Sequence, residues 1–158
     1  MDGYHGDCSG TFIAGKTDDD AIRLITQTRL ALDNCIALCK PGVPLYAIGD
    51  EVQRIADENG YGVVPGFCGH GIGHEFHMPP QIIHAFNRMP GIMKKGMVFT
   101  IEPIFNETPY GSYIMHDDQW TILTIDGARS AQFEETIVIT DDGADIMTKH
   151  KPGYFDKM

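Results

Sequence analysis

The sequence lacks any long apolar run, and this excludes one class of protein at the outset. None of its 158 residues lies in a stretch approaching the roughly 20 consecutive apolar residues that a helix needs to cross a bilayer. The hydrophobic fraction of 42% is nevertheless ordinary for a globular protein with a core. The length fits one domain. We therefore expect a single domain covering residues 1–158, with no membrane partner.

Basic residues are also scarce. Lysine and arginine number 12 against 22 acidic residues, which gives a formal net charge of −10. A nucleic-acid-binding protein usually carries a basic patch, and none is present in the sequence. We therefore predict no nucleic-acid partner. The acidity is typical of a solvated surface and is also compatible with a site rich in carboxylate metal ligands.

Cysteine is sparse, and its spacing argues against a structural zinc site. The four cysteines are Cys8, Cys35, Cys39 and Cys68, and none forms a CxxC pair. Cys35 and Cys39 are four residues apart on an expected helix, so we interpret them as one face of a buried helix. Free thiols in a domain of this size favour a reducing compartment. Cytoplasm is the default location, with an organellar form left open.

Two helices are expected, at about Asp18–Lys40 and Pro44–Asn59. Three aspartates open the first, where acidic groups suit the positive end of the helix dipole, and Pro41-Gly42 stops it. Asn59-Gly60 ends the second. Apolar residues recur at helical spacing in both segments, which predicts one buried face for each helix.

From Tyr61 onward the pattern changes to β. The expected strands are YGVVPGF, GMVFTIEPIF, WTILTI, AQFEETIVIT and ADIMT. We predict a Gly- and His-rich loop at Gly69–His77 and irregular structure at Gln81–Lys95. The whole pattern predicts an α+β fold, with two helices on one face of a mostly antiparallel sheet.

The start of the sequence resembles the middle of a hairpin. Asp2-Gly3 is a strong two-residue hairpin-turn signal, and the segment YHGDCSGTFIAG that follows reads as a strand. The partner strand would precede Met1. We therefore expect an unpaired strand edge here, through which copies of the chain self-associate.

Carboxylates occur inside the expected strands, where they are costly unless paired or bound to metal. Asp7 lies in the first strand, Glu102 in VFTIEPIF and Glu134 in AQFEETIVIT. Each alone has a default interpretation as a solvent-facing residue or a salt-bridge partner. The three together, with the Gly-flanked His70, favour a shared metal site. Three carboxylates and an imidazole suit Mn, Fe, Co or Zn.

Four segments carry a more specific resemblance. GYHGDCSGTF, CGHGIGHEFH, FTIEP and SAQFEET resemble the metal-ligand blocks of type I methionine aminopeptidases, in the same order and at similar spacings. DDQWTI is similar to the segment that places an aromatic residue near the active site. The resemblance implies a partial pita-bread fold and removal of the initiator methionine from nascent polypeptides. It also implies divalent metal ions, two per intact site.

The resemblance assigns roles to individual residues. Asp7, His70, Glu102 and Glu134 match metal ligands. Glu102 and His77 match catalytic groups, one handling the proton of the attacking water and the other contacting the substrate carbonyl. His77, Phe76 and Trp120 match residues that line the substrate site.

The remaining histidines receive ordinary interpretations. We expect His74, His84 and His116 to be loop or surface residues, His5 not to bind metal, and His150 to be solvated in a polar tail.

The sequence departs from the family at two places, and three functional alternatives stay open. The position of one further aspartate ligand falls before Met1, so we expect this chain to hold only one ion. Glu135 stands where the family often has histidine. The alternatives to a methionine aminopeptidase are an inactive pita-bread module, a protein-binding pita-bread module and an Xaa-Pro type aminopeptidase.

Overall fold

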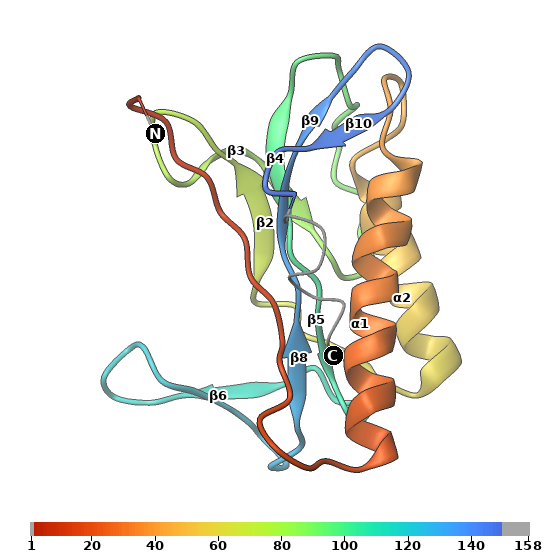
Figure 1. The fold of residues 1–158 in the computed structure, drawn as a ribbon, viewed down its shortest axis with the longest axis vertical. Coiled ribbons are helices and arrows are strands. Elements are labelled where there is room, and N and C mark those ends of the chain that lie inside the picture. Colours follow the sequence, from red (N-terminus) through yellow and green to blue (C-terminus); the bar gives the residue numbers. More distant parts are fainter. Residues whose placement is uncertain (1, 150–158) are drawn as a thin grey trace.

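A computed structural model describes residues 2–149 of the chain. Figure 1 shows helices α1 (Asp19–Leu38) and α2 (Tyr46–Asn59) side by side along one side of the β-structure. The strands of the described residues are β1 (Gly62–Val63), β2 (Cys68–Gly71), β3 (Met78–Ile83), β4 (Val98–Ile101), β5 (Ile104–Asn106), β6 (Tyr113–Met115), β7 (Ile122–Thr124), β8 (Ser130–Gln132), β9 (Glu135–Ile139) and β10 (Ala144–Ile146). Within residues 2–149, neither helix is both long and apolar enough to cross a membrane.

Both helices begin and end close to the predicted positions, because their boundaries carry local signals. The Asp18 side chain caps α1 by accepting a hydrogen bond from the N–H of Ala21 at 2.9 Å. Gly60 ends α2 in the left-handed conformation, with φ of 73°. Cys35 and Cys39 are buried in the core, as predicted, although Cys39 caps the end of α1 rather than lying inside it.

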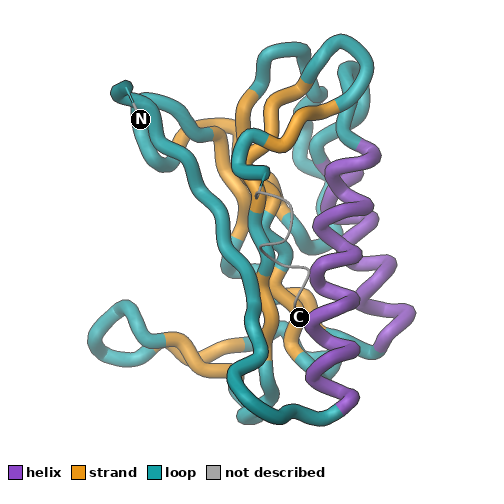
Figure 2. Tube along the Cα trace, viewed as in Figure 1, coloured by secondary structure: helices purple, strands orange, loops and turns teal. Residues whose placement is uncertain are grey.

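The strands form antiparallel sheets, and β4 is the central strand of the largest one. One sheet has the order β10-β9-β4-β2-β3, a second has the order β1-β5-β8, and β6 pairs with β7 as a separate hairpin. Figure 2 shows this hairpin projecting away from the helices. The core lies between the helices and the sheets, where Leu32 and Ile48 pack in one cluster with Phe99, Ile101 and Ile137. The predicted α+β arrangement is confirmed.

Several strand boundaries differ from the prediction. The expected loop at Gly69–His77 contains most of β2, and the irregular segment at Gln81–Lys95 begins inside β3. Glycine lowers β-propensity, so the CGHG segment gave no strand signal. The segments GMVFTIEPIF and AQFEETIVIT are each divided into two strands that belong to different sheets.

The predicted N-terminal strand is wrong in detail. Asp2 and Gly3 do form a turn with positive φ, at 51° and 85°, as the hairpin signal indicated. The residues that follow, 4–14, are extended but contain no strand, and a single bridge joins Ser9 to Glu134. In Figure 1 this red segment runs along the sheets on the side away from the helices.

Candidate metal centre

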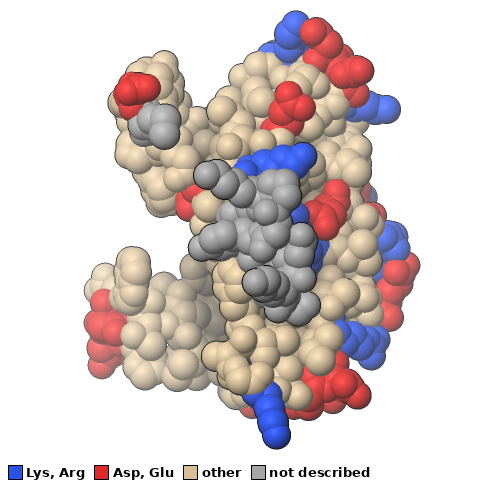
Figure 3. Space-filling view, in the orientation of Figure 1, with Lys and Arg blue, Asp and Glu red and all other residues tan. Residues whose placement is uncertain are grey.

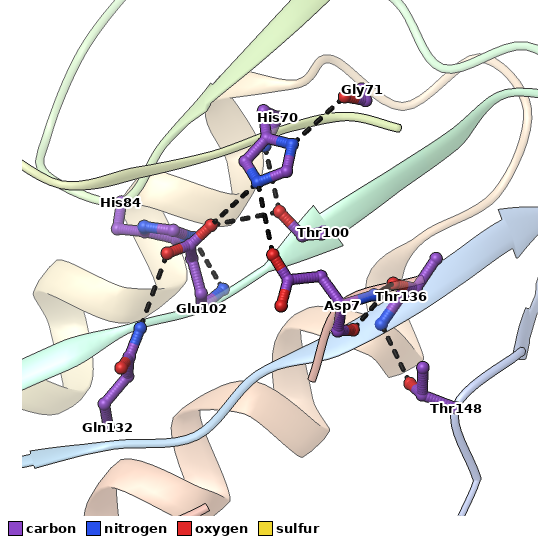
Figure 4. A network of polar contacts seen from close by, with 9 residues as sticks. All are labelled: Asp7, His70, Gly71, His84, Thr100, Glu102, Gln132, Thr136 and Thr148. Atoms are coloured by element: carbon purple, nitrogen blue, oxygen red, sulfur yellow. Dashed lines mark hydrogen bonds and ion pairs between the residues drawn. The ribbon is translucent and has the colours of Figure 1, made fainter. Parts of the chain in front are cut away.

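Four residues from four segments converge where the two larger sheets meet. His70 Nε2 lies 3.8 Å from Asp7 Oδ2 and 3.7 Å from Glu102 Oε1. One potential ligand atom from each of Asp7, His70 and Glu134 lies within 4.8 Å of the others. Figure 4 shows the side chains of Asp7, His70 and Glu102 pointing toward one another. The residues that the sequence singled out as metal ligands are therefore neighbours in space.

The two glutamates occupy equivalent positions at the seam between the sheets. Glu102 follows β4 and precedes β5, whereas Glu134 follows β8 and precedes β9. Ile101 pairs with Glu135 on one side of the break, and Ile104 pairs with Gln132 on the other. Residues 102–103 therefore lie opposite residues 133–134. Pro103, which has no N–H to donate to a ladder, suits this interruption.

His70 is held in one orientation by its own strand. Its Nδ1 lies 3.0 Å from the carbonyl oxygen of Gly71. A carbonyl only accepts hydrogen bonds, so Nδ1 donates to it, and Nε2 is the ring nitrogen that faces the carboxylates. This is the arrangement expected of a histidine that ligates a metal through Nε2.

The glycines on either side of His70 permit the close packing of its strand. A Cβ added to Gly69 would lie 2.2 Å from the carbonyl oxygen of Thr100 on β4, and one added to Gly71 would lie 2.1 Å from that of Pro79 on β3. No other residue type fits there without moving a neighbouring backbone. The two glycines of CGHG thus allow β2 to carry His70 between β3 and β4.

Burial makes the carboxylate cluster unfavourable without a cation. Burial, opposed by the Thr100 hydroxyl and by His70, raises the pKa of Glu102 to about 7. Burial and then the charges of Glu102 and Asp7 raise the pKa of Glu134 to about 8. A divalent ion would relieve both effects by neutralising the crowded negative charge. The donor set therefore fits such an ion.

Glu134 and Glu135 are neighbours with different surroundings. Glu134 lines a cleft of about 600 Å³ together with Asp7, His70 and Glu102. Glu135 is buried, lies 3.6 Å from Arg29 Nη1 and accepts a hydrogen bond from the Thr148 hydroxyl. Glu135 is therefore a partner of α1 and does not belong to the cluster.

The cleft opens between two projecting parts of the chain. Figure 3 shows this side hollowed between the β6–β7 hairpin and the loop beside the N-terminal turn. His77 lines the cleft, and its ring centroid lies 4.4 Å from that of His70. Phe76 contacts the ring of His77 at 4.6 Å and is 41% exposed. Trp120 is 87% exposed beside the β6–β7 turn, and in the described residues neither aromatic side chain lines the cleft.

One histidine has a role that the sequence did not predict, and two threonines were missed. His84 lies in the loop after β3, within the expected loop or surface placement, but it is 1% exposed and its Nε2 accepts the backbone N–H of Glu102 at 3.1 Å. The apolar sequence QIIHAF around it was the available signal of burial. Thr100 and Thr136 contact candidate ligands through their hydroxyls, which nothing in their local sequence indicated.

The other histidine interpretations have mixed outcomes. His74 and His116 are exposed, as predicted. His5 is exposed, and its Nδ1 lies 3.0 Å from the carbonyl of Gly73. His150 lies outside the described residues.

Comparison with known proteins supplies the family. The sequence pattern of metallopeptidase family M24 matches residues 1–141. The chain belongs to metallopeptidase family M24. Among its relatives, methionine aminopeptidase 1D, mitochondrial, from Danio rerio is 48% identical over 94% of this M24 chain and 44% of the relative. Methionine aminopeptidase from Buchnera aphidicola is 44% identical over 95% of this chain and 57% of the relative.

Solved structures agree with the sequence comparison. Methionine aminopeptidase from Rickettsia prowazekii matches with a TM-score of 0.90 and 38% identity, over 94% of this M24 chain and 60% of that chain. Prolidase from Pyrococcus furiosus matches with a TM-score of 0.74 and 25% identity. The match covers 94% of this chain and 38% of the prolidase chain. The predicted partial pita-bread fold is confirmed. The M24 chain spans about half the length of the curated relatives it matches.

Proposed function

We propose that this chain is a single catalytic-type domain whose metal centre serves in removal of the N-terminal methionine from polypeptides. The observation that carries the proposal is the convergence of Asp7, His70, Glu102 and Glu134 beside an open cleft. The methionine aminopeptidases that share 43–48% identity with the chain support the substrate class.

The centre is proposed to hold one divalent ion through Asp7, His70, Glu102 and Glu134. Three carboxylates and an imidazole whose Nε2 faces two of them form a hard donor set suited to Co, Mn, Fe or Zn. When bound, such an ion supplies positive charge that polarises a peptide carbonyl and acidifies water.

Two residues of the chain are proposed to act on the substrate. Glu102 accepts the proton of the attacking water and passes it to the leaving amine, a role that suits a carboxylate that lines the cleft beside the ion. His77 lines the cleft and donates a hydrogen bond to the carbonyl oxygen as negative charge develops there. Phe76 and Trp120 are proposed to line the path of the peptide, since both are exposed near the projections that flank the cleft.

Two other functions share this fold. An Xaa-Pro type peptidase is represented among the similar structures by the Pyrococcus furiosus prolidase, but its identity of 25% is well below that of the methionine aminopeptidases. A non-enzymatic binding module has no need of a buried carboxylate cluster, so the convergence of the four residues favours an enzyme.

Self-association and location complete the proposal. Large apolar side chains of the β6–β7 hairpin region are 49–87% exposed, namely Ile114, Met115, Trp120, Leu123 and Ile125. We propose this surface, in addition to the N-terminal edge predicted from the sequence, as a place where copies of the chain associate, which sedimentation would detect. Cytoplasm stays the expected location; the relatives include proteins named mitochondrial and chloroplastic.

The test compares two peptides on the Mn²⁺-loaded chain. We expect slow release of methionine from Met-Ala-Ser and no release of alanine from Ala-Pro. A preference for Ala-Pro would contradict the methionine assignment. A chain that binds Mn²⁺ but contacts neither peptide, by turnover or by calorimetry, would favour the binding module.

A further inference from the structure

The N-terminal segment runs along β8, Glu134 and β9 in one constant antiparallel register. Ser9 and Glu134 exchange both backbone hydrogen bonds, at 3.2 and 3.0 Å. In an antiparallel ladder the next hydrogen-bonded pairs lie two residues away on each side. Those pairs are Asp7 with Thr136 and Thr11 with Gln132.

At both of these positions a threonine hydroxyl replaces the direct backbone pair. The N–H of Asp7 donates to Thr136 Oγ1 at 3.1 Å, and Thr136 Oγ1 donates to the carbonyl of Asp7 at 2.7 Å. Thr11 bridges Gln132 in the same way, at 3.0 and 2.7 Å. The inserted hydroxyls hold the two backbones apart, which explains why the predicted N-terminal strand is absent from residues 4–14.

Thr136 has a cross-strand partner with an equivalent role. Thr100 on β4 is its Cα partner on β9, and the two side chains are 0% and 2% exposed. Thr100 Oγ1 accepts the N–H of His70 at 3.0 Å and donates its proton to Glu102 Oε1 at 3.0 Å. Figure 4 shows Thr100 between His70 and Glu102, and Thr136 beside the backbone of Asp7.

We infer that Thr100 and Thr136 are a buried hydroxyl pair that positions Asp7, His70 and Glu102 for the metal ion. Each hydroxyl has one proton, and each proton is donated to a candidate ligand residue. Among the described residues, neither threonine lines the cleft, so both act through the ligands rather than as ligands. The inference rests on the proposed metal centre and adds residues that set its geometry.

A buried threonine that only stabilises the fold should not affect metal binding when its hydroxyl is removed. Buried threonines commonly satisfy their hydroxyl on their own helix, as Thr28 does by donating to the carbonyl of Leu24 at 2.7 Å. Thr28 is 0% exposed, like Thr100, but is not bonded to any candidate ligand. Thr28→Val is therefore the matched control, since it removes one buried hydroxyl while keeping a β-branched side chain.

The experiment is a calorimetric titration of the metal-free chain with Mn²⁺, and with Co²⁺ followed by visible absorption. Loss of a group that orients metal ligands typically lowers metal affinity by about 10–100-fold. We expect that loss in Thr100→Val and in Thr136→Val, with a changed Co²⁺ spectrum. We expect Thr100→Ser and Thr136→Ser to bind within about threefold of the unaltered chain, because the hydroxyl remains. Thr28→Val should lower the unfolding temperature without changing metal affinity.

The outcomes separate this inference from the proposed function. If the unaltered chain binds Mn²⁺ and the valine variants bind it equally well, the positioning role is wrong while the metal centre stands. If the unaltered chain binds no divalent ion, the metal centre itself is wrong. Should a valine variant fail to fold, serine and alanine variants, which differ by one hydroxyl, replace it. Equal affinity in those two would overturn the inference.

Discussion

Glu134 and Glu135 are consecutive residues whose carboxylates serve different parts of the molecule. Glu134 lines the cleft beside Asp7, whereas Glu135 lies against Arg29 of α1. Successive side chains point to opposite faces of a strand, so the start of β9 sends one carboxylate to each side. The same substitution at the two positions should therefore affect different properties: metal binding at Glu134 and the stability of the fold at Glu135.

Glu134→Gln should abolish or strongly weaken divalent-ion binding, because it removes a charged ligand. It should not lower the stability of the metal-free chain, since it also removes a carboxyl whose pKa is raised by burial and by neighbouring carboxylates. Glu135→Gln should leave metal affinity unchanged and lower the free energy of unfolding by about 1–2 kcal/mol, through loss of a charge-assisted contact. Titration calorimetry and urea unfolding of both variants check this. Equal loss of metal binding in the two would contradict the assignment.

His84 makes the stability of the metal-free chain depend on pH. Burial lowers the pKa of His84 to about 4, below the value of about 6.5 in an unfolded chain. The unfolded state therefore binds the proton more readily, and stability is lost as pH falls from about 6.5 toward 4. The difference between pH 7.5 and pH 5 should be about 2 kcal/mol from this residue alone.

The measurement compares urea unfolding of the unaltered chain with that of His84→Gln at these two pH values. Glutamine keeps an acceptor for the N–H of Glu102 but does not titrate. In His84→Gln the free energy of unfolding should therefore lose the difference of about 2 kcal/mol between pH 7.5 and pH 5 that His84 contributes. An unchanged difference between pH 7.5 and pH 5 would show that His84 is not buried in its neutral form.

Gly69 should tolerate no side chain. Its added Cβ would approach the carbonyl of Thr100 to 2.2 Å, so Gly69→Ala should lower the free energy of unfolding by about 1–3 kcal/mol or more. It should also weaken Mn²⁺ binding, because β2 carries His70. Gly6→Ala is the control, since nothing lies within 4 Å of its added Cβ. Thermal unfolding checks both, and equal melting temperatures for the two variants would refute the packing argument.

His77 should matter for turnover and not for metal content. His77→Ala should lower kcat for Met-Ala-Ser by about 10²-fold while the chain still binds Mn²⁺. His116→Ala, at an exposed site on the β6–β7 hairpin, should change neither. Unchanged turnover with normal metal content in His77→Ala would remove the proposed role.

The sequence predicted features that depend on local signals and missed those that depend on distant partners. Asp18 and Gly60 mark helix ends by their own side chain or backbone, so α1 and α2 were predicted within two residues. The strand β2 was missed because its glycines disfavour β-structure and are explained only by the close approach of β3 and β4. The N-terminal strand was predicted wrongly because the hydroxyl of Thr136, 129 residues from Asp7 in sequence, enters its ladder.

In the candidate site, too, the sequence predicted residues that have a local signal and missed those that depend on distant partners. Asp7, His70, Glu102 and Glu134 were selected by residue type, strand context and family resemblance, and they lie together. Thr100 and Thr136 have no chemical signature in their own segments, and the apolar segment around His84 indicates burial but not its contact with Glu102. Their contacts with the cluster exist only after the sheets are assembled.

The proposed metal centre also predicts proton release. The pKa of Glu102 and that of Glu134 are raised to about 7 and about 8 in the metal-free chain, so both carboxyls are partly protonated near neutral pH. A divalent ion must displace those protons, so affinity should rise as pH increases from 6 to 8. Calorimetry in two buffers of different ionisation enthalpy measures the release. Binding that neither releases protons nor depends on pH would contradict the carboxylate ligand set.

The most direct test of the central claim is a Mn²⁺ titration of the unaltered chain beside Asp7→Asn, His70→Ala and Glu134→Gln. The account predicts one ion per chain and at least a tenfold loss of affinity in each variant. Failure of the unaltered chain to bind any divalent ion, or full affinity in all three variants, would contradict it.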